Sequence, residues 1–337
     1  MKFEFNERHS KSLLNVVEAF AGIGAQQEAL RLLGINTESK VIEIDKNASD
    51  AYNILHGKTE NLGDITKVQT LADCDLFTYS FPCTNISTLN PKQGFDVTDD
   101  TASSLLWACQ HLIEKHQPHY LLMENVANIL NATHHVTLKK WISFLDSLGY
   151  HSKLIHLQGY LFNVPQVRNR VFLVSSKTPF DFKNTTDCSV TSIQKNDLIV
   201  HQLKRETPFF VKLDDILERN VDAKYFLSEK AIARLHRSKN PLVIKYADKQ
   251  NPINSHTIHK NYHKMEGRTQ QYVWDLDTQK PRRFTPRECY RLMGWHNDRI
   301  ETILPHFSDT THYQLTGNSI IIPVLQYLFD CLLSNKT

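Results

Sequence analysis

The chain has 337 residues, of which 22% are charged and 41% hydrophobic, and its formal net charge is +3. This composition is typical of a globular protein with one large domain, or with a core domain and a smaller lobe. No apolar run approaches the roughly 20 residues of a membrane helix, and the first ten residues are too polar for a signal peptide. Six scattered cysteines without a CxxC pair argue against a metal site or a disulfide framework and for a reducing cytoplasm.

Short β-rich runs alternate with amphipathic stretches in the first half of the chain. The apolar runs predict buried strands at Leu14–Ala19, Val41–Ile44, Leu76–Ser80, Tyr120–Met123 and Val171–Val174. Apolar residues at helical spacing predict helices at Ala25–Leu33, Ala48–Leu55, Ser103–Lys115 and Val136–Leu148. This alternation is typical of an α/β fold with a mostly parallel sheet, whose ligands bind at the carboxyl ends of the strands.

The alternation stops after Ser175, where a polar and irregular stretch begins. Residues 176–299 contain 23 Lys and Arg against 15 Asp and Glu, a net charge of +8. A basic lobe suits a polyanion, although a solvated charged surface is the alternative explanation. We expect a first domain at 1–175, a second at 176–280, and a C-terminal part at 281–337 that returns to the first domain and ends in a helix at Ile320–Leu333.

A glycine-containing turn, Phe20-Ala-Gly-Ile-Gly24, follows the first strand and opens a helix. Glycines allow a tight turn and a close approach of the backbone to a ligand. The second strand leads to Glu43, where a ribose diol would bind, and Asp64 offers a third acid to an exocyclic amine. Because the turn lacks the GK[ST] of a phosphate-binding loop, a nucleoside cofactor is favoured over ATP.

A thiol and a carboxylate follow two neighbouring strands, at Cys83 and Glu124. A thiolate can add to a pyrimidine ring carbon while an acid handles the charge that develops on the ring nitrogen. Either residue alone has an ordinary structural explanation, because cysteines are commonly buried as small apolar residues and glutamates commonly cap helices.

The order of these motifs decides between the two explanations. The chain contains, in sequence, FAGIG (20–24), EID (43–45), GDI (63–65), SFPC (80–83), ENV (124–126), QVRNR (166–170), RRFTPRECYRLMGW (282–295) and GNSI (317–320). This set resembles the DNA cytosine-5 methyltransferase family, of the bacterial type II modification methylase type. The resemblance implies a Rossmann-like S-adenosylmethionine-dependent methyltransferase sheet, residues 1–175, with a smaller target-recognition domain, residues 176–280.

The resemblance also implies which residues bind S-adenosylmethionine. These are Phe20, Ala21, Gly22, Ile23, Gly24, Glu43, Ile44, Asp64, Ile65, Pro82, Asn318 and Ser319. Ile44 stands where the family often has an aromatic residue, so we expect weaker packing against adenine.

In the mechanism that the resemblance implies, the Cys83 thiolate attacks C6 of cytosine, and C5 then accepts the methyl group. Glu124 hydrogen-bonds the ring. Arg170, near the target O2, is the expected source of the field that favours the thiolate, since a cysteine thiol has a pKa near ~8.5. Arg168 is placed with the catalytic residues, or binds phosphate instead. Gln166, Arg168 and Arg170 alternate along one predicted strand and are expected to face one side.

Double-stranded DNA is the implied substrate, with the target nucleotide flipped out of the stack. The expected DNA contacts are Ser87, in the loop after the thiol, together with Gln166, Arg282, Arg283 and Arg287. Base reading is expected within residues 176–280.

Two alternatives remain open from the sequence. One is a transfer-RNA cytosine-5 methyltransferase of the same family, and the other is a catalytically silent nucleic-acid-binding module. We expect a monomeric, cytoplasmic enzyme, and the family allows a cognate restriction endonuclease as a partner.

Overall fold

The computed structural model describes residues 13–82, 105–206, 211–237, 244–245, 255–264 and 271–334. The chain divides into two compact units, both discontinuous in sequence. The sheet unit comprises Lys2–Leu157, Asn169–Thr207 and Val324–Thr337, and the second unit comprises mainly Gln158–Arg168 and Pro208–Pro323.

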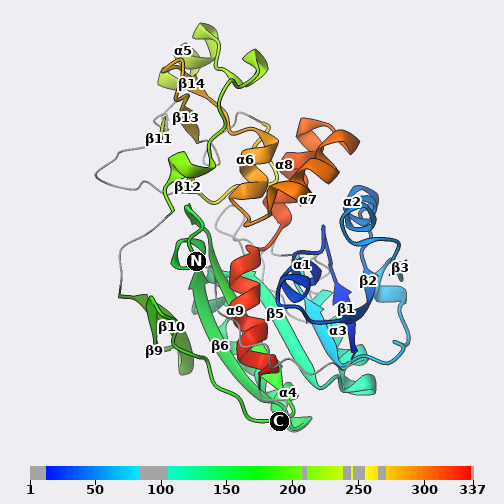
Figure 1. Cartoon of the computed structure of the whole chain (residues 1–337). Coiled ribbons are helices and arrows are strands. Elements are labelled where there is room, and N and C mark those ends of the chain that lie inside the picture. The colour runs from blue at the N-terminus through cyan, green and yellow to red at the C-terminus, as the bar shows by residue number, and fades with distance from the viewer. Residues whose placement is uncertain are drawn as a thin grey trace. The chain divides into compact units, whose positions relative to one another are not determined.

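A nine-stranded sheet forms the centre of the sheet unit, in the order β3-β2-β1-β4-β5-β8-β6-β10-β9 (Figure 1). Strands β3, β2, β1, β4 and β5 are parallel, and β8 runs antiparallel to β5. The strands are β1 (Leu14–Ala19), β2 (Thr37–Ile42), β3 (Glu60–Asn61), β4 (Leu76–Tyr79), β5 (Tyr120–Val126), β6 (His151–Gln158), β8 (Asn169–Ser176), β9 (Cys188–Lys195) and β10 (Leu198–Arg205). The predicted α/β fold with a mostly parallel sheet is therefore confirmed.

The helices between these strands are α1 (Ala25–Leu32), α2 (Lys46–His56), α3 (Leu106–His116) and α4 (His135–Ser147). One face of the sheet packs on α3 and α4, and Trp141 of α4 is fully buried there with its Nε1 donating to the Tyr79 hydroxyl at 3.1 Å. Local signals set the helix ends. The Asp45 carboxylate caps α2 by accepting from the Ala48 amide, and Gly57, with φ 88°, ends that helix.

The hairpin β9–β10 was not predicted, since its residues fall in the stretch interpreted as an irregular second lobe. It extends the central sheet, because β10 pairs in parallel with β6 through Val200 and Leu154. The first predicted boundary, at residue 175, thus differs from the structural division, in which the sheet unit continues to Thr207. Pairing between β10 and β6 is a long-range contact that composition does not reveal.

The second unit holds shorter elements. Its strands are β7 (Gln166–Val167), β11 (Ile244–Lys245), β12 (Ser255–His256), β13 (Tyr272–Trp274) and β14 (Pro281–Arg282). Its helices include α5 (Glu229–Arg237), α6 (Pro286–Arg291), α7 (Asn297–Ile303) and α8 (Asp309–Asn318). Strand β12 pairs with β7, and β11, β13 and β14 form a three-stranded sheet.

The last helix, α9 (Ile322–Leu333), begins in the second unit and continues in the sheet unit from Val324. In this division Val324–Thr337 belong to the sheet unit and residues 281–323 to the second unit, whereas the sequence predicts that all of 281–337 returns to the first domain. The stretch Asp309–Leu333 is the one segment of the described chain that is long and apolar enough for a membrane span. Because 78% of its most apolar window is buried inside the structure, it resembles a core helix and gives little support to a span.

Candidate active site

The glycine turn after β1 has a backbone conformation that few side chains tolerate. Phe20, Gly22 and Gly24 all have positive φ, at 57°, 57° and 75°. Phe20 is an L residue in the left-handed region, which costs about 1–2 kcal/mol and tends to occur at functional sites. A Cβ on Gly22 would meet no atom within 4 Å, so the turn leaves open space on that side. Ala21 and Ile23, by contrast, are buried and anchor the turn.

Helix α2 supports this turn from the other side. The His56 Nε2 lies 3.1 Å from the Ile23 carbonyl oxygen, so this nitrogen must carry the donated proton. A Cβ on Gly24 would lie 2.5 Å from that nitrogen and 2.6 Å from Tyr52 Cε2. Glycine is thus required at position 24 by both its φ and its neighbours. Neither Tyr52 nor His56 was predicted from the sequence, although their helical spacing in α2 places both on one face.

Tyr52 also joins the turn to a buried acid. Its hydroxyl donates to Glu18 Oε1 at 2.5 Å, and Glu18 is fully buried on β1. Burial raises the pKa of Glu18 to about 7, and the hydrogen bond from Tyr52 opposes this rise.

The predicted ribose ligand, Glu43, is held by backbone amides. Its Oε2 accepts from the Gly22 amide at 2.9 Å and its Oε1 accepts from the Asp45 amide at 2.8 Å. Desolvation raises the pKa of Glu43, and these two amides oppose that rise. The next side chain, Ile44, is 77% exposed, which makes it one of the largest exposed apolar surfaces in the described residues.

Asp64 caps a short 3-10 helix, η1 (Ile65–Lys67). Its Oδ1 accepts from the hydroxyl and the amide of Thr66 at 2.8 and 3.0 Å, and Lys67 Nζ lies 3.8 Å from its Oδ2. The hydrogen bond from the Thr66 side chain is the main reason that the pKa of Asp64 is lowered. Ile65 is 5% exposed and packs in the core of the sheet unit.

Glu124 and Arg170 form an ion pair on the sheet. Arg170 Nε lies 2.7 Å from Glu124 Oε1, and the two side chains are only 16% and 12% exposed. The antiparallel register of β5 and β8 explains the contact. Arg170 lies opposite Val126, so Glu124 is its diagonal neighbour on the same face. The sheet itself therefore holds the two side chains together.

The residue after Glu124 contacts the backbone that precedes the predicted thiol in the sequence. The Asn125 side chain is buried, and its Nδ2 donates to the Phe81 carbonyl oxygen at 3.2 Å. Phe81 directly precedes the half-buried Pro82, which begins the predicted thiol peptide. Cys83 and Ser87 themselves lie outside the described residues. Asn125 thus links the strand that carries the acid to the backbone that leads to the thiol, a role that the sequence did not reveal.

Comparison with known proteins decides the family. The model of the C-5 cytosine-specific DNA methylase family matches residues 14–334, nearly the whole chain. The chain belongs to this family.

Relatives and solved structures agree with this assignment. The type II methyltransferase M2.ScrFI of Lactococcus lactis subsp. cremoris is 33% identical over 300 residues, which cover 85% of this chain and 74% of that protein. M1.ScrFI of the same organism is 28% identical over 97% of this chain and 80% of its own length. The structure of the Entamoeba histolytica methyltransferase EhMeth matches with a TM-score of 0.74 at 19% identity, covering 95% of this chain and 99% of that one, which shows a shared fold.

Three predicted residues of this C-5 cytosine methylase do not share one strand face. The strand is interrupted at Arg168, so that Gln166 lies in β7 of the second unit and Arg170 in β8 of the sheet unit. Gln166 is fully buried, and its Nε2 donates to the Leu292 carbonyl oxygen at 2.6 Å. Arg168 is 3% exposed and donates to backbone carbonyls. In the structure, Gln166 and Arg168 thus make buried contacts within the second unit. The expected DNA contact of Gln166 and the catalytic or phosphate-binding role of Arg168 stay predictions.

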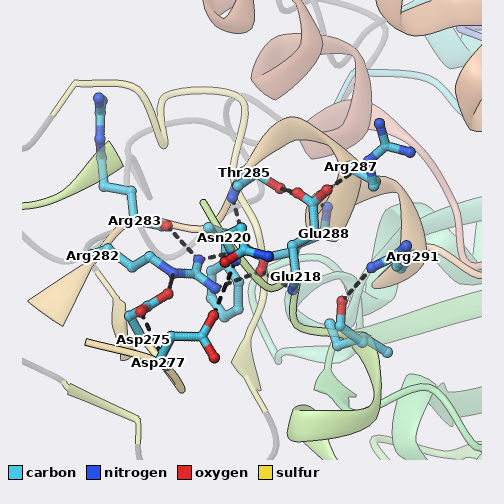
Figure 2. Close-up of polar contacts among 12 residues, drawn as sticks. Glu218, Asn220, Asp275, Asp277, Arg282, Arg283, Thr285, Arg287, Glu288 and Arg291 are labelled. Carbon is cyan, nitrogen blue, oxygen red and sulfur yellow. Dashed lines mark hydrogen bonds and ion pairs between the residues drawn. The ribbon is translucent and has the colours of Figure 1, made fainter. Parts of the chain in front are cut away.

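Most of the arginines expected to contact DNA around α6 form ion pairs with acidic residues of the chain (Figure 2). Arg282 is fully buried, with its Nε 3.0 Å from Asp275 Oδ2 and its NH2 2.7 Å from Glu288 Oε1, so it is not available to a phosphate. Arg287 is half-buried and paired with Glu218, 2.7 Å away, and with Glu301. Burial and these ion pairs argue against the predicted DNA contact of Arg282.

Arg283 differs from these neighbours. Its side chain points away from the cluster in Figure 2, and its NH2 lies 3.4 Å from the Lys224 carbonyl oxygen. It is therefore the arginine of this group best placed to bind phosphate. The predicted cofactor residues Asn318 and Ser319 lie at the end of α8 in the second unit, where Ser319 is 6% exposed.

Proposed function

We propose that this enzyme transfers a methyl group from S-adenosylmethionine to C5 of a flipped-out cytosine in a specific sequence of duplex DNA. The observation that carries the proposal is the Glu124–Arg170 pair on neighbouring strands, beside the strand that leads into the Phe81-Pro82-Cys83 peptide. Family membership and its type II relatives support DNA as the substrate. The net charge of residues 208–323, 18 Lys and Arg against 13 Asp and Glu, is consistent with a polyanion.

The residues around the glycine turn fit an adenosine-type cofactor. Gly22 leaves open space, the exposed Ile44 offers an apolar surface, and Glu43 is oriented by two amides with lone pairs left for a diol. Phe20, Asp64 and Pro82 complete the expected set in the sheet unit. The family resemblance alone supports Asn318 and Ser319 as cofactor residues. When bound, S-adenosylmethionine supplies the methyl group.

The chemistry assigned to the chain's own residues follows from the weakness of C5 as a nucleophile. The Cys83 thiolate forms a bond to C6, and the displaced π electrons make C5 electron-rich. After C5 has gained the methyl group, a base such as water takes the C5 proton, and the thiolate leaves C6, which restores the aromatic ring. The Glu124 carboxylate accepts a hydrogen bond from the exocyclic amine, and from N3 when the ring is protonated there as charge develops. Arg170 holds the Glu124 carboxylate in one orientation and places positive charge beside the ring.

The test is expression of the protein followed by bisulfite sequencing of plasmid DNA from the same cells. Methylated cytosines within one recurring sequence, absent from cells that express Cys83→Ser, are expected. Labelled methyl transfer to transfer RNA alone would instead identify the RNA substrate. Failure of 5-fluorocytosine DNA to trap the protein covalently, with the cofactor present, would indicate a silent binding module.

We expect the enzyme to act as a monomer in the cytoplasm, because methylation of one strand at a time needs no twofold symmetry. The names of the type II relatives make a cognate restriction endonuclease a reasonable functional partner.

A further inference from the structure

The buried side chain of Arg168 joins two distant segments of the second unit. Its NH1 donates to the Ile258 carbonyl oxygen at 3.0 Å. Its NH2 donates to the carbonyl oxygens of Gly317 and Ser319 at 3.0 and 2.6 Å. A guanidinium is a rigid planar fork, so the positions of these three acceptors are tied to one another.

The first segment is the backbone around Ile258, which lies along the chain that precedes Arg168. Strands β7 and β12 pair in parallel, and the Thr257 hydroxyl donates to the Val167 carbonyl oxygen at 2.8 Å. The Ile258 amide donates to Gln166 Oε1 at 3.0 Å. Both polar groups of Ile258 are thus held by side chains, the amide by Gln166 and the carbonyl by Arg168.

The second segment is the end of α8. Gly317 and Ser319 supply carbonyls at the C-terminus of this helix, where the negative end of the helix dipole favours a cation. Gly317 also packs against the first segment, because a Cβ there would lie 2.1 Å from the Lys260 amide nitrogen. The two segments are therefore in direct contact as well as bridged by Arg168.

We propose that Arg168 is a positioning residue that couples cofactor binding to DNA binding. The inference rests on the proposed function, in which Asn318 and Ser319 contact the cofactor and the basic stretch that contains Ile258 contacts DNA. A ligand that fixes either segment fixes the guanidinium, and through it the other segment. Such coupling is reciprocal, so DNA must tighten cofactor binding by the same factor by which the cofactor tightens DNA binding.

The test is calorimetric titration of S-adenosylhomocysteine into the full chain, with and without a DNA duplex. The duplex carries the recognition sequence that bisulfite sequencing identifies. For the wild-type protein we expect the duplex to tighten binding by roughly tenfold, within the usual range of coupling factors. In Arg168→Met we expect the duplex to tighten binding by no more than about twofold. In Arg168→Lys we expect an intermediate coupling factor, because a point charge replaces the planar guanidinium.

Gln166→Leu is the matched control. It removes a buried side-chain contact to Ile258 but none to Gly317 or Ser319, so we expect weaker DNA binding and a lower Tm with the coupling factor retained. A merely structural role for Arg168 would make the two variants alike, and Arg168→Lys keeps the test open if Arg168→Met does not fold.

Three results would overturn the coupling role. The first is a coupling factor of one in the wild-type protein, and the second is a coupling factor that stays unchanged in both Arg168 variants. The third is a loss of coupling in Gln166→Leu as large as that in Arg168→Met. These results are distinct from failure of the proposed function, which would show as absence of methyl transfer by the wild-type protein.

Discussion

Gly317 lies so close to the backbone of Lys260 that no side chain fits between them. A Cβ at Gly317 would be 2.1 Å from the Lys260 nitrogen and 2.4 Å from the His259 carbonyl carbon. The obstructing atoms belong to backbone, so they cannot move aside as the end of a flexible side chain can. The glycine of the GNSI motif is therefore required by packing within the second unit, in addition to any requirement of a bound cofactor.

We expect Gly317→Ala to lower the free energy of unfolding by about 3 kcal/mol, at the upper end of the cost of overpacking. Gly34→Ala is the control, because Gly34 has φ 71° but open space around it. It should cost only the backbone strain, about 1 kcal/mol. Urea unfolding of both variants measures the difference, and equal losses would contradict the steric explanation.

The Glu124–Arg170 pair is expected to act as a coupled unit in catalysis. Glu124→Gln should lower kcat by about 10²-fold or more, because it weakens stabilisation of the charge that develops on the ring. Arg170→Met should lower kcat as well, since Glu124 then loses its orienting partner. If the ion pair is the functional unit, the double variant will be no slower than the worse single variant, and strictly multiplicative losses would show independent roles.

The pH dependence of stability should reveal Glu18. Because its folded-state pKa, about 7, lies above the ordinary value of 4.5, the folded state binds more protons than the unfolded state between these values. The contribution is fully present below pH 4.5 and is lost as the pH rises through 7. We expect the wild-type protein to lose about 3 kcal/mol relative to Glu18→Gln over this interval. Urea unfolding at several pH values measures the slope, and parallel curves would rule out a raised pKa.

Support of the glycine turn by His56 is expected to affect cofactor binding. His56→Leu removes the donor to the Ile23 carbonyl, and loss of one hydrogen bond of about 1 kcal/mol should weaken binding of S-adenosylmethionine about fivefold. His56→Gln can restore the donor and should recover much of the affinity. Gly24→Ala should be more severe, and combining it with His56→Ala should relieve only the contact with His56, while the contact with Tyr52 and the φ strain remain. Calorimetry of the four proteins tests this order.

Arg282 and Arg283, adjacent in sequence, should separate stability from DNA binding. Arg282→Met leaves Asp275 and Glu288 buried without their cation and should cost about 3–5 kcal/mol of unfolding free energy. Arg283→Gln should leave stability within about 0.5 kcal/mol, as is usual for surface substitutions. If Arg283 binds a phosphate, the same variant should reduce the slope of log affinity against log salt by about 1. An unchanged slope would remove Arg283 from the DNA contacts.

The short-range signals in the sequence were sufficient for the general architecture. Strand and helix periods and the positions of the glycines predict an α/β sheet with polar residues after its strands, because these signals depend on neighbours in the chain. The antiparallel pairing of β5 and β8 then brings Glu124 and Arg170 together.

The tertiary structure alone decided which polar residues are structural. Gln166, Arg168 and Arg282 have the same residue types as functional groups, yet all three are buried and bonded to residues far away or across a turn. The hairpin β9–β10 joins the sheet for a similar reason, since its partner β6 is distant in sequence. Burial and long-range hydrogen bonding are properties of the folded chain, and a local pattern of charges carries no information about either.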